Sequence, residues 1–351
     1  MLLYLHIPFC DSKCFYCSFN SYTNLHDRIK SYFYALNESL KWQLRHFNIT
    51  KNSIETLFIG GGTPSVANAK YYENIFKTLE PFLKENSEIT CEANPNSATK
   101  EWLKEMKTLG VNRFSFGVQS FNEDKLKALN RAHSSKEAID AINNAYSIGV
   151  ENISLDIIYD FYLDTKELLQ KDINQAFALP INHISTYELI IQKGTSFNKT
   201  PEVKQNKESF NFFIRDEISK KFPWYEVSNY GLYKSSHNLG YWRHKEYLGV
   251  GAGAVGFINN KRYYPHSNID KFIKEPFYYK KETLNFNEIK TEKIFLGLRS
   301  EVGVREEILN PKEQEIANLL VKEKKLEYKN GYYFNKDYFL ADELALFIMQ
   351  N

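Results

Sequence analysis

The segment Cys10-Asp-Ser-Lys-Cys14-Phe-Tyr-Cys17 carries three cysteines on one short loop, directly after the apolar run Leu2–Ile7. Thiolates this close together in a chain can hold one iron–sulfur cluster. Most such clusters take four protein ligands and this loop supplies three. One iron is then left open, in the way that catalytic metal sites keep an open position. The spacing therefore indicates a [4Fe–4S] cluster with a free coordination site.

An open iron of this kind can chelate the amino and carboxylate groups of S-adenosylmethionine (SAM). An electron from the cluster then cleaves the sulfonium and releases a 5′-deoxyadenosyl radical. The alternative is a zinc site, which usually needs a fourth cysteine or histidine at matched spacing. His6 and His26 are candidates, but neither forms the second half of a Cys-x2-Cys pair. We therefore assign Cys10, Cys14 and Cys17 to the cluster.

The composition is ordinary for a globular chain: of 351 residues, 43% are hydrophobic and 25% are charged. The formal net charge of +2 implies no bulk attraction to nucleic acid, so we expect no nucleic-acid partner. Three of the four cysteines are clustered, which argues against a disulfide scaffold and for a reducing compartment. No basic segment follows Met1 and no apolar run is long enough to span a bilayer. We therefore expect a cytoplasmic protein without a transmembrane segment.

Short β-rich runs alternate with helical patterns through most of the chain. The predicted strands are Leu2–Ile7, Glu55–Ile59, Glu88–Glu92, Arg113–Val118, Asn152–Ile158 and His183–Tyr187. The predicted helices include ranges 27–47, 67–84, 99–109, 164–179 and 204–222. Asp164, with Glu167 three residues on, is the expected N-cap of the fourth of these helices. Six such βα units predict an α/β fold in the form of an open, partial (βα)6 barrel.

Polar residues stand where these strands end. Gly60–Thr63 follows the second strand, Glu92 ends the third, Gln119 lies just past the fourth and Asp156 lies near the end of the fifth. Chemistry on α/β barrels takes place at the C-terminal ends of the strands. We therefore expect these residues to form one site with the cysteine loop.

The last hundred residues have a different pattern. Ranges 291–299 and 312–324 are predicted helices, 326–334 is a hairpin that turns at Asn330-Gly331, and a final helix starts at Ala341. We expect a core over residues 1–230 and an α+β winged-helix-like domain over residues 231–351. DNA binding is disfavoured, because the helix 312–324 carries Glu313 and Glu315 where a reading helix needs arginine or lysine. A lid or docking surface for the site is the preferred interpretation.

Several motifs occur in order along the chain: Tyr4-Leu-His-Ile-Pro-Phe-Cys10, the cysteine loop, Gly60-Gly-Gly-Thr-Pro64, Gly117-Val-Gln-Ser-Phe121, Asn130-Arg-Ala-His133 and Asn152–Tyr159. Together they resemble the radical SAM family of oxygen-independent coproporphyrinogen III oxidases, over nearly the whole chain. The chain departs from the family in one place. Members usually continue the fifth strand with a Gly-Leu-Pro-Gly-type turn, and here Asp160-Phe-Tyr-Leu163 leaves the geometry of that loop open.

Three features resemble the haem chaperone (HemW-type) branch of this family rather than the oxidases. The oxidases have a fourth cysteine two residues past the third, where this chain has Phe19. They also carry a long N-terminal extension, whereas Tyr4 is nearly the first residue here. Finally, His237-Asn-Leu-Gly-Tyr-Trp242 resembles the His-Asn-x-x-Tyr-Trp motif of the chaperones.

The resemblance implies a haem chaperone that binds haem, SAM and a [4Fe–4S] cluster. It would work as a homodimer and deliver haem to haem proteins such as respiratory enzymes. We expect such a protein to cleave SAM but to lack coproporphyrinogen III dehydrogenase activity. Two alternatives stay open: an oxygen-independent coproporphyrinogen III dehydrogenase, which converts two propionate side chains to vinyls, and a radical SAM enzyme with another substrate.

For SAM, the resemblance implies contacts from Tyr4, Tyr16, Gly61, Gly62, Thr63, Glu92, Gln119, Arg131 and Asp156. Glycine removes the Cβ that would block a close approach, carboxylates suit the ribose hydroxyls and amino group, and an arginine suits the carboxylate. Taken singly, each polar residue could instead be structural. Gly251 and Gly253 either pass near the adenosine or belong to a tightly packed strand. Cys91 is expected to be a small core residue.

For haem, the candidate axial ligand is His237, because imidazole commonly ligates haem iron. Tyr241 and Trp242 could stack on the macrocycle. The alternative is that Asn238 and Tyr241 only fix a loop, and His237 with them. His244 and His266 are further candidates, which we rank lower.

Overall fold

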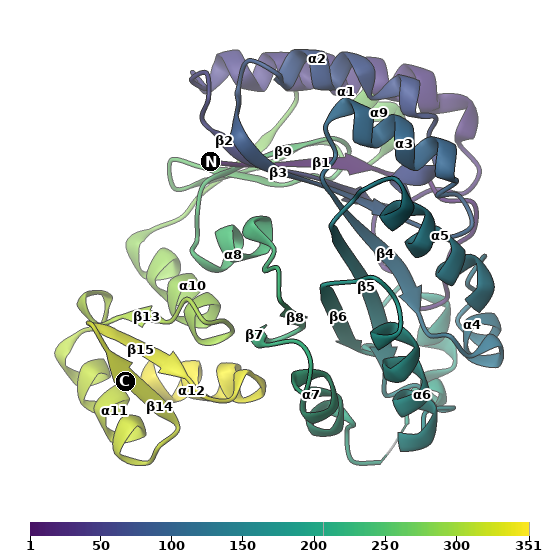
Figure 1. Ribbon diagram of the computed structural model, residues 1–351. Coiled ribbons are helices and arrows are strands. Elements are labelled where there is room, and N and C mark those ends of the chain that lie inside the picture. The colour runs from purple at the N-terminus through teal and green to yellow at the C-terminus, as the bar shows by residue number, and fades with distance from the viewer. Residues whose placement is uncertain (206, 351) are drawn as a thin grey trace.

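The computed structural model describes residues 1–205 and 207–350. Its main feature is a twelve-stranded sheet in the order β12-β11-β10-β9-β1-β2-β3-β4-β5-β6-β8-β7, in which β1 to β6 run parallel. These six strands are β1 (Leu2–Ile7), β2 (Ile54–Gly61), β3 (Leu83–Ala93), β4 (Arg113–Gln119), β5 (Asn152–Tyr159) and β6 (His183–Glu188). They form the open, partial α/β barrel that the sequence predicts, with helices on the outer face and the short helix α8 on the inner side (Figure 1).

The outer helices follow the parallel strands in sequence. They are α1 (Ile29–His46), α2 (Glu73–Leu79), α3 (Lys100–Leu109), α4 (Glu123–Ala128), α5 (Ser135–Ser147), α6 (Lys166–Phe177) and, after β6, α7 (Asn211–Ser219). Side-chain caps define several of their starts. Thr99 accepts a hydrogen bond from the backbone N–H of Trp102, and Ser134 forms a capping box with Glu137. Because helices cover one face of the strands and the barrel interior lies on the other, the strands are near-continuous apolar runs.

Three local predictions were wrong at the ends of elements. The helix predicted over 67–84 is shorter, because Pro81 cannot continue a helix and Leu83 already pairs with Ile54 in the sheet. The helix predicted over 204–222 begins only at Asn211. Asp164 does not cap α6, since its carboxylate accepts hydrogen bonds from the Lys125 ammonium and a backbone N–H, and Thr165 is the cap instead.

The loop after β5 takes the place of a glycine-rich turn. Asp160 has φ of +65°, in the left-handed region that favours glycine. Its buried carboxylate accepts hydrogen bonds from the backbone N–H of Phe210 at 2.9 Å and from the Ser209 hydroxyl at 2.6 Å. These bonds hold the segment before α7 over the end of β5, so Asp160 meets the conformational demand that a glycine would meet in the family pattern.

Six further strands, which the sequence did not predict, complete the sheet, and two unpredicted helices lie between them. They are β7 (Trp224–Glu226), β8 (Asn229–Gly231), α8 (Ser236–Trp242), β9 (Tyr247–Val250), β10 (Gly256–Ile258), β11 (Lys261–Tyr264), α9 (Ile269–Lys274) and β12 (Lys280–Thr283). Strand β9 runs parallel to β1 on its free edge. A Cβ on Gly249 would lie 2.2 Å from the carbonyl oxygen of Val255. The glycine-rich run therefore belongs to a tightly packed strand and turn.

A second hydrophobic core forms the C-terminal unit, apart from the barrel in Figure 1. Its elements are α10 (Phe286–Leu298), β13 (Val304–Arg305), α11 (Pro311–Lys322), β14 (Leu326–Lys329), β15 (Tyr332–Asn335) and α12 (Ala341–Ile348). The helix, helix, hairpin, helix order is as expected, with β13 added to the hairpin. This core starts at Ile294, later in the chain than the expected boundary between residues 230 and 231, because β9 to β12 join the main sheet. None of the described helices is long and apolar enough to cross a membrane.

Candidate functional site

A cavity of about 340 Å³ lies at the C-terminal ends of the parallel strands. Its walls include all three clustered cysteines and most of the residues that the sequence analysis assigned to SAM. The residues from that analysis are Cys10, Cys14, Tyr16, Cys17, Gly61, Gly62, Thr63, Glu92, Gln119, Arg131 and Asp156. The structure therefore brings together, in one place, residues from the loop after β1 and from β5, which lies four strands away in the sheet. We call it the cysteine cavity.

The cysteine loop wraps around one end of this cavity. The Thr63 hydroxyl donates to the Cys10 sulfur at 3.4 Å, and an Arg131 N–H donates to the Cys14 sulfur at 3.2 Å. The backbone N–H of Cys17 donates to the carbonyl of Cys14, which closes a tight turn. Burial raises the pKa of the Cys10 and Cys17 thiols, so both need a metal or another positive group to become thiolates at neutral pH.

The donor set suits a cluster better than a single ion. Within residues 1–205 and 207–350, no three His, Cys, Asp or Glu side chains converge closely enough to hold one metal ion. A cubane cluster takes one thiolate on each of several irons, so it spaces its protein ligands more widely than one ion does. Three cysteines on the wall of one cavity are a donor set of the kind that iron–sulfur clusters use.

Gly61 and Gly62 pass directly under the cysteine loop. A Cβ on Gly62 would lie 2.7 Å from the carbonyl oxygen of Phe9 and 3.0 Å from the Cys10 sulfur. Gly61 has φ of +119°, and a Cβ there would lie 2.6 Å from the ring of His6. Only glycine allows this approach of the second strand's backbone to the first strand and its loop.

Two carboxylates, Glu92 and Asp156, face this cavity. Burial is the main cause that raises the pKa of Glu92 to about 7 and that of Asp156 to about 6, and their proximity adds to the shift at Glu92. One Glu92 oxygen accepts the backbone N–H of Gly61 at 3.2 Å. Such carboxylates favour a ligand that brings a positive charge or hydroxyl donors.

Arg131 and Gln119 lie at the edge of the cysteine cavity. Besides Cys14, Arg131 donates to Asn94 Oδ1 at 2.7 Å and to Tyr16 Oη at 3.3 Å. Gln119 has φ of +71°, an unusual conformation for a residue other than glycine, at an irregularity between β4 and β5. Asn94 was not predicted as a site residue, although its position directly after the end of β3 is the signal that could have identified it.

A second cavity, of about 480 Å³, adjoins the first. It shares Ser18 and Phe19 with the cysteine cavity, and Phe19 is 68% exposed. The SAM and haem candidates that line it are Tyr4, Gly253, His237 and Tyr241, and its other lining residues are His6, Asn20, Phe58, Asn238, Tyr247, Ala254 and Val255. We call it the histidine cavity. The structure thus places Tyr4 here rather than in the cysteine cavity, with its hydroxyl 3.0 Å from His6 Nδ1.

Gly251 and Trp242, which the sequence analysis assigned to SAM or haem, lie outside both cavities, and Cys91 lies inside the core. A Cβ on Gly251 would lie 2.7 Å from the hydroxyl of Tyr32, so this glycine serves packing beside β1. Trp242 lines a different pocket, next to the C-terminal unit. Cys91 is fully buried in the main core, as expected.

The short helix α8 holds His237 inside the barrel. The Glu88 carboxylate on β3 accepts the backbone N–H groups of Ser236 at 2.7 Å and His237 at 2.9 Å, at the positive end of the helix. His237 Nδ1 lies 2.7 Å from the Thr56 hydroxyl, whereas its buried Nε2 has no hydrogen-bond partner among the described residues. Burial lowers the pKa of His237 to about 3, so its imidazole is neutral.

Aromatic rings enclose the imidazole of His237. The centroid of the Phe58 ring lies 5.0 Å from that of the imidazole, and the Tyr241 ring meets it edge-on at 4.7 Å. His237 and Tyr241 are four residues apart and therefore share one face of the helix. A neutral imidazole with one nitrogen fixed and the other free is the form that ligates metals.

An open parallel barrel with three cysteines after its first strand and glycines after its second has the architecture of a radical SAM protein. The sequence profile of the Radical SAM superfamily matches residues 4–176, and such a domain implies a [4Fe–4S] cluster and SAM. The fold is also that of coproporphyrinogen III oxidase (HemN) from Escherichia coli. The two structures superpose with a TM-score of 0.81 over 99% of this chain and 89% of that one, at 18% identity.

Comparison with proteins of known name shows to which family of radical SAM proteins the chain belongs. The chain is 34% identical to the heme chaperone HemW of Lactococcus lactis, over 86% of this chain and 82% of that protein. It is 33% identical to the heme chaperone HemW of Bacillus subtilis, over 86% of this chain and 84% of that protein. The chain therefore belongs to the HemW family of radical SAM proteins.

Proposed function

We infer that this protein is a haem chaperone, which binds haem beside a [4Fe–4S] cluster and SAM and hands the haem to haem proteins such as respiratory enzymes. One observation carries the proposal: the cysteine and histidine cavities share the wall formed by Ser18 and Phe19. The second cavity offers a neutral imidazole whose Nε2 has no partner in the described chain. The names of the relatives point to the same activity. We further propose a cytoplasmic homodimer.

The cluster and SAM would occupy the cysteine cavity. Cys10, Cys14 and Cys17 would ligate the cluster, which supplies the electron for cleavage of SAM when it is bound. Because Gly61 and Gly62 have no side chain, their backbone packs directly against the first strand and the cysteine loop, and both residues line the cavity beside the Cys10 sulfur. Glu92, Asp156, Gln119 and Arg131, together with Tyr16 and Thr63, would orient SAM through the hydrogen bonds that their positions around the cavity allow.

Haem would enter the histidine cavity, with the His237 imidazole as axial ligand. Thr56 fixes Nδ1, so Nε2 is the nitrogen available for iron. That nitrogen is closed off from solvent here. A neighbouring ring must turn aside before iron can reach it, and Tyr241, which lines this cavity and packs on the imidazole, is the ring we assign to this movement.

Replacing His237 with alanine is expected to abolish saturable haem binding or to change the Soret spectrum of the bound haem. The physical reason is the loss of the His237 Nε2 atom, the one imidazole nitrogen of the cavity without a hydrogen-bond partner among the described residues. The measurement is an anaerobic haem titration of the cluster-reconstituted protein. His266→Ala is the matched control, because His266 lies outside the cavity and pairs with Glu275; it should bind haem as the parent does.

If His237→Ala binds haem with unchanged affinity and an unchanged Soret spectrum, His237 is not the axial ligand of the haem iron. A sustained conversion of coproporphyrinogen III to protoporphyrinogen, in the presence of SAM and a reductant, would overturn the chaperone function itself. Cys10, Cys14 and Cys17 would then serve a dehydrogenase.

The affinity for SAM should increase with pH by roughly tenfold between about pH 6 and 8. Glu92 and Asp156 are protonated and neutral below their raised pKa values of about 7 and 6, and become negative above them. The sulfonium of SAM stays positive throughout, so the ionised carboxylates attract it more strongly. Isothermal titration at several pH values measures the effect. Glu92→Gln should reduce the increase in SAM affinity at the upper end of this pH range. If the variant shows the same pH dependence as the parent protein, Glu92 does not contribute to SAM binding in this way.

A further inference from the structure

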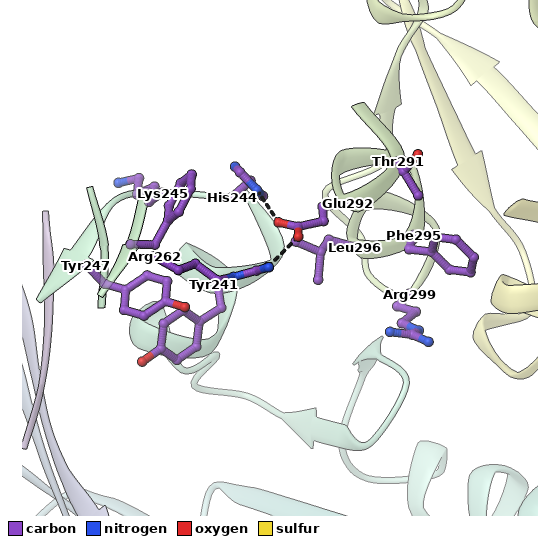
Figure 2. A pocket seen from close by; sticks show the side chains of 11 residues that line it. Tyr241, His244, Lys245, Tyr247, Arg262, Thr291, Glu292, Phe295, Leu296 and Arg299 are labelled. Atoms are coloured by element: carbon purple, nitrogen blue, oxygen red, sulfur yellow. Dashed lines mark hydrogen bonds and ion pairs between the residues drawn. The ribbon is translucent and has the colours of Figure 1, made fainter. Parts of the chain in front are cut away.

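A third cavity, of about 450 Å³, lies between α8, the strands β9 to β11 and α10. Figure 2 shows its residues: Tyr241, His244, Lys245, Tyr247, Phe257, Arg262, Thr291, Glu292, Phe295, Leu296 and Arg299. It shares Tyr241 and Tyr247 with the histidine cavity. The rings of these two tyrosines meet edge-on, with their centroids 4.8 Å apart. Two aromatic side chains are thus the common wall of the two cavities.

Three cationic side chains, Lys245, Arg262 and Arg299, line the third cavity, and Glu292 is the one acidic residue among the described residues that line it. Lys245 is paired with Glu55 and Arg299 with Asp342, so Arg262 is the cation whose closest carboxylate partner, Glu292, lies in the cavity wall. Figure 2 shows both oxygens of the Glu292 carboxylate engaged, one by His244 Nε2 at 2.8 Å and the other by the Arg262 guanidinium. The Glu292 side chain is 25% exposed and that of His244 is 7% exposed, so this ion-pair cluster is partly shielded from water.

The rest of the wall is apolar and aromatic. Phe257 packs on the ring of His244, with centroids 4.7 Å apart, and Phe295 and Leu296 come from α10. A cavity with aromatic walls and an arginine among its lining residues fits a flat, largely apolar ligand that carries carboxylates. Tetrapyrroles with propionate side chains have this chemistry.

We propose that the third cavity is the carboxylate end of the haem site, and that Tyr241 divides one continuous site into two in the structure. This rests on the proposed function. The macrocycle occupies the histidine cavity, its iron faces His237, and its propionates extend past Tyr241 to Arg262 and His244. The Glu292 carboxylate accepts hydrogen bonds from both residues in the structure, and a propionate takes its place when haem binds. The same movement of Tyr241 that uncovers His237 opens the passage between the cavities.

The test compares haem with haem dimethyl ester, which keeps the macrocycle and iron but has no negative carboxylate. The reconstituted full-length protein should bind haem more tightly than the ester. Arg262→Gln should weaken haem binding by roughly tenfold and leave ester binding unchanged, since a charge-assisted hydrogen bond is lost for haem alone. Glu292→Gln removes the competing carboxylate, so it should tighten haem binding without affecting the ester.

Arg45→Gln, an exposed arginine on α1 that lines neither cavity, is the control and should change neither affinity. Equal affinities of the parent protein for haem and the ester would overturn the inference while leaving the proposed function in place. An equal loss of both ligands in Arg262→Gln, without a gain in Glu292→Gln, would also overturn it. A parent protein that binds neither ligand would instead contradict the proposed function.

Discussion

Replacing Cys14 with alanine is expected to remove the iron–sulfur cluster from the purified protein. The loop supplies only three thiolates, so the loss of one leaves two ligands, too few to hold a four-iron cluster. Iron and acid-labile sulfide, measured after anaerobic reconstitution, should fall to background. Saturable SAM binding should be lost with them, because the open iron is the main anchor that we assign to the amino and carboxylate groups of SAM.

Cys91→Ala is the matched control for this experiment. Cys91 is fully buried in the core on β3, so it should keep the full iron and sulfide content and lose only a little stability. Cys14 is partly exposed, and its sulfur takes part in a hydrogen bond from Arg131, so its replacement should leave the fold intact. Full iron and sulfide content in Cys14→Ala, with an unchanged circular dichroism spectrum, would contradict the three-cysteine assignment.

Replacing Lys125 with methionine is expected to lower the free energy of unfolding by about 3–5 kcal/mol. The Lys125 ammonium donates to the Asp164 carboxylate at 2.6 Å and to the carbonyl oxygen of Ile158 at 2.7 Å, and both charged side chains are fully buried. Methionine fills a similar volume but leaves the Asp164 carboxylate without its cation. Urea unfolding of the reconstituted protein under anaerobic conditions measures the change.

Two further variants make this prediction specific. Lys41→Met removes a surface pair with Glu38, at 2.9 Å and with both side chains about a third exposed, and should cost less than about 1 kcal/mol. The double variant Lys125→Met with Asp164→Leu removes both buried charges and should recover part of the lost stability. A loss in Lys125→Met no larger than that in Lys41→Met would refute the argument.

The Lys125–Asp164 pair also shows where prediction from local sequence failed. An aspartate just before an apolar helical pattern, with a glutamate three residues on, is a typical helix start. Lys125 lies 39 residues earlier in the chain, and only the packing of α4 against the end of β5 brings its ammonium to Asp164. Thr165 then takes over the role of the cap.

The motif His237-Asn-Leu-Gly-Tyr-Trp242 illustrates the same limit. From sequence alone, Tyr241 and Trp242 were expected to stack together on the macrocycle, and no helix was predicted for the motif. The structure makes it the helix α8, in which His237 and Tyr241 share a face while Trp242 is rotated by about 100° to another pocket. Helical geometry, rather than proximity in sequence, separates the two aromatic side chains.

The sequence by itself determined the features that depend on neighbouring residues. The spacing of Cys10, Cys14 and Cys17 indicated the cluster. The alternation of short apolar runs with helical patterns predicted the partial barrel. Both signals can be recognised in short segments of the sequence. The common edge of parallel strands further predicted that Glu92 and Asp156 would meet.

Only the tertiary structure decided how the other end of the chain completes the site. It adds β9 to the free edge of β1 and inserts α8 into the barrel. His237 thereby meets Thr56, which lies 181 residues away in sequence, and its backbone N–H reaches Glu88, which lies 149 residues away. Such contacts form because whole helices and strands pack together and bury their apolar faces. No short stretch of sequence specifies that packing.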